Sequence, residues 1–324
     1  MDIHKRSLQI GLAVLLFALL LRLGGRLADK LVYAVSQPKV ASTILFLETG
    51  RMVRAAQPEA PTQVTEAAEE TVVTEPTEPA PQSITFTSSD VGKVKVNNRT
   101  SKAVDVSSLM QLPLSWELKS ASPTVLIYHT HGTESYSEIS GYRTRDNNYN
   151  MIAIGDAVEK RLTEAGLSVI HDTVTHDYPS YDGSYASSRK SVAQYLEEYP
   201  SIKLVLDLHR DSMTDSSGKQ IQTSVNGAAQ MMLVMGIEVG SVVFPNWKEN
   251  MALAVKLHAL LEQKTPGIMR PLCIRAQRFN QDLCTGALLI EMGAAGNTQA
   301  QALKSADLLC DAIIELSHGG VFQS

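Results

Sequence analysis

Short apolar runs recur through the last two thirds of the chain, each with the length of a buried β-strand. They lie at residues 124–129, 167–171, 203–208, 231–235, 272–275 and 287–291. Most are rich in Val, Ile, Leu or Met, a composition typical of strands that are covered on both faces of a sheet. The pattern therefore predicts a central sheet.

Amphipathic stretches with helical spacing fill much of the sequence between these runs. Residues 150–165 place Ile154 and Leu162 on one face of a helix, and further helices are predicted at 246–263 and 298–316. The alternation of strand and helix patterns predicts an α/β domain, with a mostly parallel twisted sheet flanked by helices.

One interruption in this alternation indicates that the sheet is mixed. Residues 220–225 and 228–234 look like two strands, and they are joined by Asn226 and Gly227. Asn-Gly is a strong signal for a tight hairpin turn, which makes its two strands antiparallel. We therefore expect a mixed sheet.

The N-terminal part of the chain has a different character. Residues 8–21 form an apolar stretch behind Lys5 and Arg6, which predicts a short transmembrane helix within an anchor segment, residues 1–30. A cleaved signal peptide is the alternative, although Arg22 and two glycines stand where a small-residue cleavage site would lie. We expect a single-pass membrane protein whose larger part is exported.

The rest of the chain is predicted to divide into four segments. Residues 31–57 form a juxtamembrane segment, and residues 58–82 form a linker with five prolines, six glutamates and no lysine or arginine. That composition cannot offset the entropy of ordering, so a disordered tether is predicted. Entry strands are expected at residues 83–113 and the catalytic domain at residues 114–324.

Composition narrows the classes of function. The apolar fraction of 44% and the charged fraction of 19% are ordinary for a folded protein, while a net charge of −5 offers no basic surface for nucleic acid. Nucleic acid is therefore not an expected partner. The three cysteines, Cys273, Cys284 and Cys310, show no paired spacing, so no disulfide framework is predicted.

Three of the predicted strands end at residues that can bind a metal. The first ends at His129 and is followed by His131 and Glu134, the third leads to His209, and the last ends at Glu291. In open α/β sheets the carboxyl ends of the strands line the ligand crevice. We therefore expect these side chains to converge, although about 160 positions separate the first from the last.

The residue types predict a zinc site. Catalytic zinc commonly takes two His and one carboxylate and keeps one open position, and His131, Glu134 and His209 form such a set. His129 is an alternative ligand or a hydrogen-bonding neighbour. Glu291 is the candidate general base, because a carboxylate that ends an apolar strand is costly to bury without a function.

Neighbouring residues have possible supporting roles. Asp207 could orient a ligating imidazole or be an acid paired with a lysine, and Arg210 could stabilise an oxyanion. The tyrosine-rich segment 178–185 is either a plain connection with a helix cap at Ser184 or a wall of a substrate groove.

Several motifs resemble those of the stage II sporulation protein P family of endospore-forming bacteria. They appear in the family's order between about residues 124 and 314. They are YHTHGTESY at 128–136, HDYPSY at 176–181, DLHRD at 207–211, RFNQD at 278–282 and GALLIEMG at 286–293.

This resemblance implies a zinc N-acetylmuramoyl-L-alanine amidase acting on peptidoglycan, with endopeptidase activity on stem-peptide cross-links. It implies a phosphorylase/hydrolase-like fold shared with zinc amidases and zinc carboxypeptidases. It also implies a membrane complex with the sporulation proteins D and M during forespore engulfment, on the septal or mother-cell membrane facing the intermembrane space.

The chain departs from the wider amidase class at one ligand. Those amidases place a glutamate near the start of the next helix, where this chain has Asn147, Asn148 and Asn150, so Glu134 is expected to take its place. Likeness to the Asp-Pro-Gly-His turn of the amidases favours His131 over His129.

Two other functions fit the same residues. A zinc carboxypeptidase that trims stem peptides would use the same His-x-x-Glu spacing of His131 and Glu134. A non-catalytic wall-binding scaffold would keep the fold without turnover.

Overall fold

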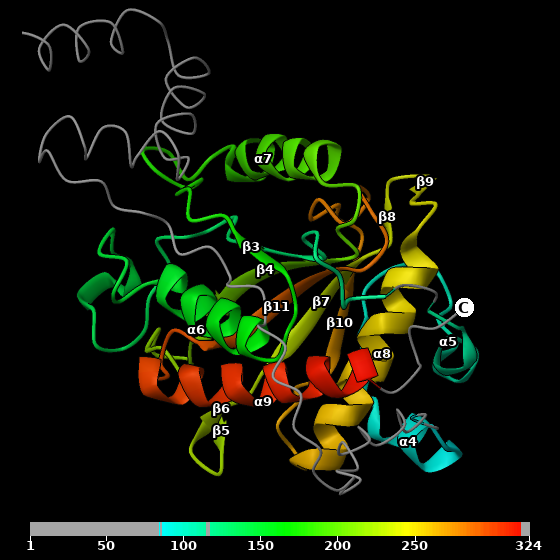
Figure 1. The fold of residues 1–324 in the computed structure, drawn as a ribbon. Helices are drawn as coiled ribbons and strands as arrows, with labels where there is room; N and C mark the ends of the chain where they lie inside the picture. Colours follow the sequence, from blue (N-terminus) through cyan, green and yellow to red (C-terminus); the bar gives the residue numbers. More distant parts are fainter. Residues whose placement is uncertain (1–83, 85, 115–116, 319–324) are drawn as a thin grey trace, which may run out of the picture. The chain divides into compact units, whose positions relative to one another are not determined.

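A seven-stranded sheet lies at the centre of the structure, a computed structural model that describes residues 84, 86–114 and 117–318 (Figure 1). The order of strands across the sheet is β1-β10-β7-β11-β4-β2-β3. Their bounds are β1 Val96–Asn98, β2 Val125–Tyr128, β3 Val169–His171, β4 Leu204–Asp211, β7 Met232–Gly236, β10 Leu272–Arg275 and β11 Ala287–Ala294.

The sheet is mixed and mostly parallel, as the sequence predicts, but the predicted hairpin forms a separate two-stranded sheet and is not the source of the antiparallel pairing. Only the pairing of β11 with β7 is antiparallel among the pairings of this sheet. The strands β11, β4, β2 and β3 therefore end at one edge, whereas β1, β10 and β7 end at the opposite edge. The three strands with metal-capable ends are neighbours and point the same way.

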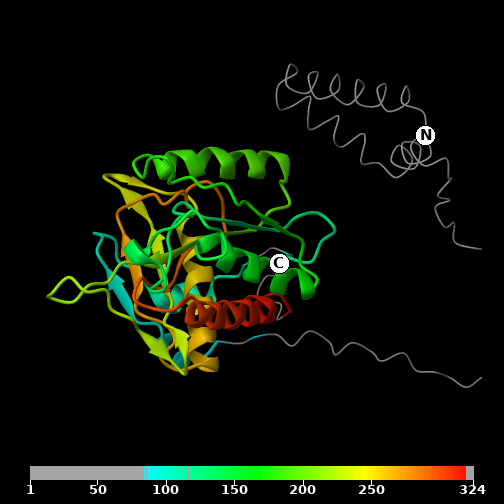
Figure 2. The ribbon, with the colours of Figure 1, turned by 90° about the vertical axis from the view of Figure 1, so that its left-hand side faces the viewer.

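Helices cover both faces of the sheet. Figure 2 shows α7 on one side and α9 on the other. The face away from α7 carries the main core, formed with α6, α8 and α9. The four longest helices are α6 Met151–Glu164, α7 Ser184–Glu198, α8 Trp247–Lys264 and α9 Gln299–His318.

Helix α7 packs on the other face through a small apolar cluster. Val192 of the helix lies with Leu126 and Tyr128 of β2 and Val205 of β4. The buried positions of α7 are otherwise Ser184 and Ser188, so its apolar face is narrow. A helix of this kind gives little hydrophobic periodicity, and it is missing from the elements that the sequence predicts.

The segment expected to hold entry strands contains one strand and two short helices, α4 Ser88–Lys93 and α5 Val106–Gln111. Polar caps explain the difference. Asp90 accepts from the backbone N–H of Thr87 at 2.8 Å, and Asp105 accepts from the N–H groups of Ser107 and Ser108. Both helices pack against α8, in which every residue from 250 to 261 is buried.

The predicted hairpin is present beside the main sheet. It pairs β5 Ser224–Val225 with β6 Ala228–Ala229, and Asn226 and Gly227 both have positive φ, at 53° and 79°. Two positive φ angles are what a type I′ turn requires. A second hairpin joins β8 Glu238–Val239 to β9 Val242–Val243, and a 3-10 turn, η1, spans Ser140–Tyr142.

The predicted membrane anchor, juxtamembrane segment and linker lie outside the described residues. Among the helices of the described ranges, none combines the length and apolar character that crossing a bilayer requires.

Candidate active site

The site lies where β2, β4 and β11 end side by side. In the parallel ladder between β11 and β4, Glu291 stands opposite His209, and in the ladder between β2 and β4, Tyr128 stands opposite Asp207. The register of the parallel ladder therefore places Glu291 next to His209, although the two residues lie far apart in the sequence.

His209 lies between two carboxylates. Its Nε2 is 2.9 Å from Oδ1 of Asp207, and its Nδ1 is 3.7 Å from Oε2 of Glu134. Burial alone would lower the pKa of His209, but the negative charge of Asp207 outweighs burial and raises it to about 9. The site thus has a negative potential that attracts a cation, whether a proton or a metal ion.

His131 packs among aromatic rings above His209. It stacks on Tyr181 with ring centroids 4.3 Å apart, and its ring stands edge-on to those of Tyr185 and His209, the latter at 5.2 Å. Its Nδ1 lies 3.3 Å from Oγ of Ser184. Burial and the neighbouring His209 lower the pKa of His131 to about 4, so the imidazole is neutral, as a metal ligand must be.

Glu134 is buried and held from two sides. Its Oε2 accepts from the backbone N–H of Arg210 at 3.1 Å, and its Oε1 lies 3.5 Å from the guanidinium of Arg143. Burial raises its pKa, and the positive charge that His209 carries when protonated opposes that shift. These contacts direct the Glu134 carboxylate toward His209.

Glu291 has no such partners. Its Oε2 is buried and accepts no hydrogen bond. Burial raises its pKa to about 8, with an opposing contribution from His209. A buried carboxyl oxygen without a partner is costly to stability, and strongly perturbed carboxyl groups gather at functional sites.

His129 is directed away from this group. Its Nδ1 lies 3.1 Å from the carbonyl oxygen of Leu208, and its Nε2 lies 2.9 Å from Nε2 of His171. Both ring nitrogens are therefore occupied, so the geometry favours His131 as the ligand.

The residues present suit a zinc ion, although their ligand atoms are too far apart to coordinate one ion without moving. His131 and His209 offer ring nitrogens and Glu134 a carboxylate, the donor set of catalytic zinc, and Glu291 leaves a buried oxygen beside them. The ligand atoms of the three do not all lie within 4.8 Å of one another. Holding an ion would therefore draw these side chains together.

The sequence does not predict the part that Arg143 plays. Its guanidinium lies 2.8 Å from Oδ2 of Asp177 and 4.6 Å above the ring of Tyr181, and it also reaches Glu134. An open pocket of about 670 Å³ beside His131 is lined by Arg143, Arg145, Tyr178 and Tyr181 among others. The tyrosine segment is thus part of a groove wall.

Arg210 does not take the position proposed for it from the sequence. Its side chain donates to the carbonyl oxygens of Ser135 at 2.9 Å and Tyr142 at 2.6 Å. It fastens the loop that carries Glu134 and is not free to meet an oxyanion.

Asn150 has a local structural role. Its side chain accepts from the N–H of Ile152 at 2.9 Å and caps α6. Where other amidases are expected to carry a ligand glutamate, this chain carries a helix cap.

Solved structures with partial likeness to the chain include N-acetylmuramoyl-L-alanine amidases. An N-acetylmuramoyl-L-alanine amidase of Nostoc punctiforme is 13% identical, with a TM-score of 0.40, and the match covers 60% of this chain and 96% of that one. One from Clostridium difficile 630 is 14% identical, with a TM-score of 0.38, covering 61% of this chain and 97% of that one. These TM-scores are too low to carry an argument about activity.

The sequence comparisons are more specific. Stage II sporulation protein P of Bacillus subtilis (strain 168) is 27% identical over 208 residues, which cover 59% of this chain and 50% of that protein. The chain thus spans about half the length of the curated relative it matches. The family model for stage II sporulation protein P matches residues 41–314, well over half of the chain. This chain belongs to the stage II sporulation protein P family.

Proposed function

We propose that this chain is a zinc-dependent peptidoglycan hydrolase that cleaves the amide between the lactyl group of N-acetylmuramic acid and L-alanine during sporulation. The observation that carries the proposal is the buried carboxyl oxygen Oε2 of Glu291, which has no hydrogen-bond partner and belongs to a residue in register with His209 at the shared edge of the sheet. Membership of the sporulation family agrees with it.

The roles follow from position. His131, Glu134 and His209 would hold the zinc. When bound, zinc would polarise the amide carbonyl and add a positive charge that favours the ionised form of Glu291. Glu291 would take a proton at Oε2 from the attacking water and return it to the leaving amine. Asp207 would orient His209 from behind, since the two lie 2.9 Å apart.

The groove beside His131 suits a glycopeptide. Tyr178 offers an aromatic face on which a sugar ring can stack, and it is about half exposed, at 51%. Arg143 and Arg145 supply positive charge for the carboxylates of a stem peptide. A single groove would then hold both parts of the bond to be cut.

The setting of this activity is part of the proposal. An N-terminal anchor would keep the enzyme on the septal or mother-cell membrane with its catalytic part in the intermembrane space. The family resemblance suggests the sporulation proteins D and M as partners.

The same two arginines favour a second candidate, a zinc carboxypeptidase. An exopeptidase needs a cation to hold the terminal carboxylate, and Arg145 stacks over Tyr178 at 4.4 Å within the pocket. This function would release single amino acids from stem peptides.

Product analysis separates the candidates. Purified full-length protein in mild detergent is incubated with intact sacculi, and soluble products are identified by mass spectrometry. An amidase frees whole stem peptides with an amino-terminal L-alanine, an endopeptidase cuts the cross-links and leaves the stem peptides on the glycan strands, and a carboxypeptidase frees one amino acid. We expect the amidase products.

The matched control is Glu291→Gln, which preserves size and removes the base. We expect the variant to bind sacculi as the wild type does and to release almost nothing. Equal release by both proteins would contradict the proposal, and no release by either with binding intact would indicate a scaffold.

A further inference from the structure

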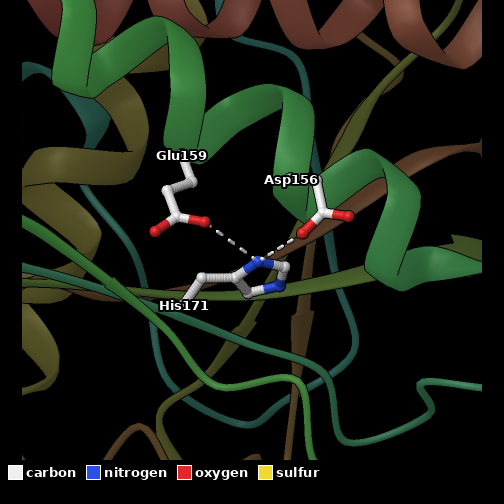
Figure 3. Close-up of side chains that lie close together, drawn as sticks. All are labelled: Asp156, Glu159 and His171. Carbon is white, nitrogen blue, oxygen red and sulfur yellow. Dashed lines mark ion pairs between the residues drawn. The ribbon is translucent and has the colours of Figure 1, made fainter. Parts of the chain in front are cut away.

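A cluster of three metal-capable side chains lies on a flank of the domain, apart from the site above. Asp156 and Glu159 stand three residues apart on α6, so they share one face of that helix, and His171 ends the edge strand β3. Figure 3 shows the imidazole facing both carboxylates. Within the described residues, no other set of three His, Cys, Asp or Glu side chains brings ligand atoms within 4.8 Å of one another.

The hydrogen-bond chain behind His171 fixes which of its nitrogens carries hydrogen. The carbonyl oxygen of Leu208 can only accept, so His129 donates to it from Nδ1. Neutral His129 must then accept at Nε2, where the neighbour at 2.9 Å is Nε2 of His171. His171 therefore donates from Nε2, and its Nδ1 presents a lone pair.

That lone pair faces negative charge. Nδ1 lies 3.1 Å from Oδ1 of Asp156 and 3.5 Å from Oε2 of Glu159. The side chain of His171 is only 2% exposed, and its Nδ1 has no hydrogen-bond partner. A lone pair and two carboxylates at this spacing repel one another unless a cation lies between them.

We propose that Asp156, Glu159 and His171 form a second divalent-cation site, distinct from the one formed by His131, Glu134 and His209. One nitrogen and two carboxylate oxygens suit zinc. Bonds of the usual length would set tetrahedral ligands about 3.3–3.6 Å apart, close to the observed 3.1 and 3.5 Å.

A proton is the competing occupant, and the geometry disfavours it. A proton on Nδ1 would make a buried imidazolium, and Nδ1 makes no well-aligned hydrogen bond to either carboxylate that would offset the cost of burying that charge. A metal ion needs no such alignment, because it sits between its ligands. The Asp156 and Glu159 side chains are 60% and 40% exposed, which leaves the ion a path from solvent and room for water ligands.

The position of the cluster suggests what the ion does. It would join α6 to the edge strand β3 and fix His171, which holds His129 against the backbone of Leu208. Leu208 directly precedes His209. The ion would thus stabilise the wall behind the active site without touching the substrate.

Zinc stoichiometry tests the proposal. The full chain is purified in mild detergent without a polyhistidine tag, stripped with a chelator and titrated with zinc chloride by calorimetry, and bound metal is counted by mass spectrometry. We expect two equivalents in the wild type. The double variant Asp156→Asn/Glu159→Gln should lose one of them or weaken it at least tenfold, with an unchanged far-UV circular dichroism spectrum.

Two further variants make the result specific. Glu164→Gln removes another exposed acid from the same helix, which lies 4.0 Å from Lys160, and should keep both equivalents. His209→Ala should lose the other equivalent. If the wild type instead binds zinc at Asp156, Glu159 and His171 but not at His131, Glu134 and His209, only the proposed function is contradicted. A double variant that binds as much zinc as tightly as the wild type would overturn the second site.

Discussion

Gly155 lies where α6 passes closest to the paired imidazoles of His129 and His171. A β-carbon built there would stand 2.6 Å from Nε2 of His129 and closer still to Nε2 of His171. Real β-carbons essentially never approach so near, so Gly155→Ala must push the rings or the helix away. The substitution should therefore break the hydrogen bond between the two histidines.

The expected magnitude combines three contributions. Overpacking a filled core costs about 1–3 kcal/mol. Leaving a buried ring nitrogen without its partner costs about 1–3 kcal/mol. Replacing Gly by Ala inside a helix returns about 1 kcal/mol. The net expectation is a loss of roughly 3 kcal/mol in the free energy of unfolding, where helix propensity alone would predict a gain.

The assay is urea unfolding of the full chain in mild detergent, followed by far-UV circular dichroism. Gly92→Ala in α4 is the matched control, because a β-carbon at Gly92 meets nothing within 4 Å. We expect that control to raise stability by up to about 1 kcal/mol. A Gly155→Ala protein as stable as the wild type would refute the close packing of α6 on the two histidines.

Three other outcomes are expected. Glu291→Gln should lower the rate of product release by about 10²–10⁴-fold while zinc content stays unchanged, and metal loss on substitution would instead make Glu291 a ligand. His209→Ala should lower bound zinc by one equivalent in elemental analysis of the full chain, and full retention would exclude His209 from the site. Burial lowers the pKa of His258 to about 4, below the ordinary 6.5, so the folded state binds fewer protons than the unfolded state between these values. Stability should therefore fall by about 3 kcal/mol as pH drops from 6.5 to 4, and His258→Gln should lose that share of the pH dependence in unfolding curves measured across this range.

The sequence predicts the general architecture because strand signals here are local. Short apolar runs such as 287–290 are typical of buried strands, and the hairpin at Asn226 and Gly227 depends on the backbone freedom of those two residues. The sequence does not predict α7, whose buried face is mostly serine, or the two short helices α4 and α5, which lie where entry strands are expected. These elements form because neighbours far along the chain pack against them.

Some residues of the candidate site can be identified from the sequence, and others only from the tertiary structure. Residue type and strand end identify His209 and Glu291, because burying a polar group at the end of an apolar strand costs free energy that only a partner or a function offsets. The contacts of Arg143 with Glu134 and Asp177 arise from tertiary structure, and a 34-residue separation carries no sequence signal for the second of them. Nothing in the sequence around His171 indicates that it pairs with His129 inside the fold.

Because β11 and β7 pair antiparallel, the strands on the two sides of this pairing end at opposite edges of the sheet. The β8–β9 hairpin follows β7 and therefore projects from the end opposite to that of Glu291, with Val239 and Val242 40% and 59% exposed. A short epitope or a fluorescent label inserted at Gly240 would sit remote from the substrate groove. That exposed hairpin is therefore a suitable position for a label, because insertions are tolerated best at exposed loop tips.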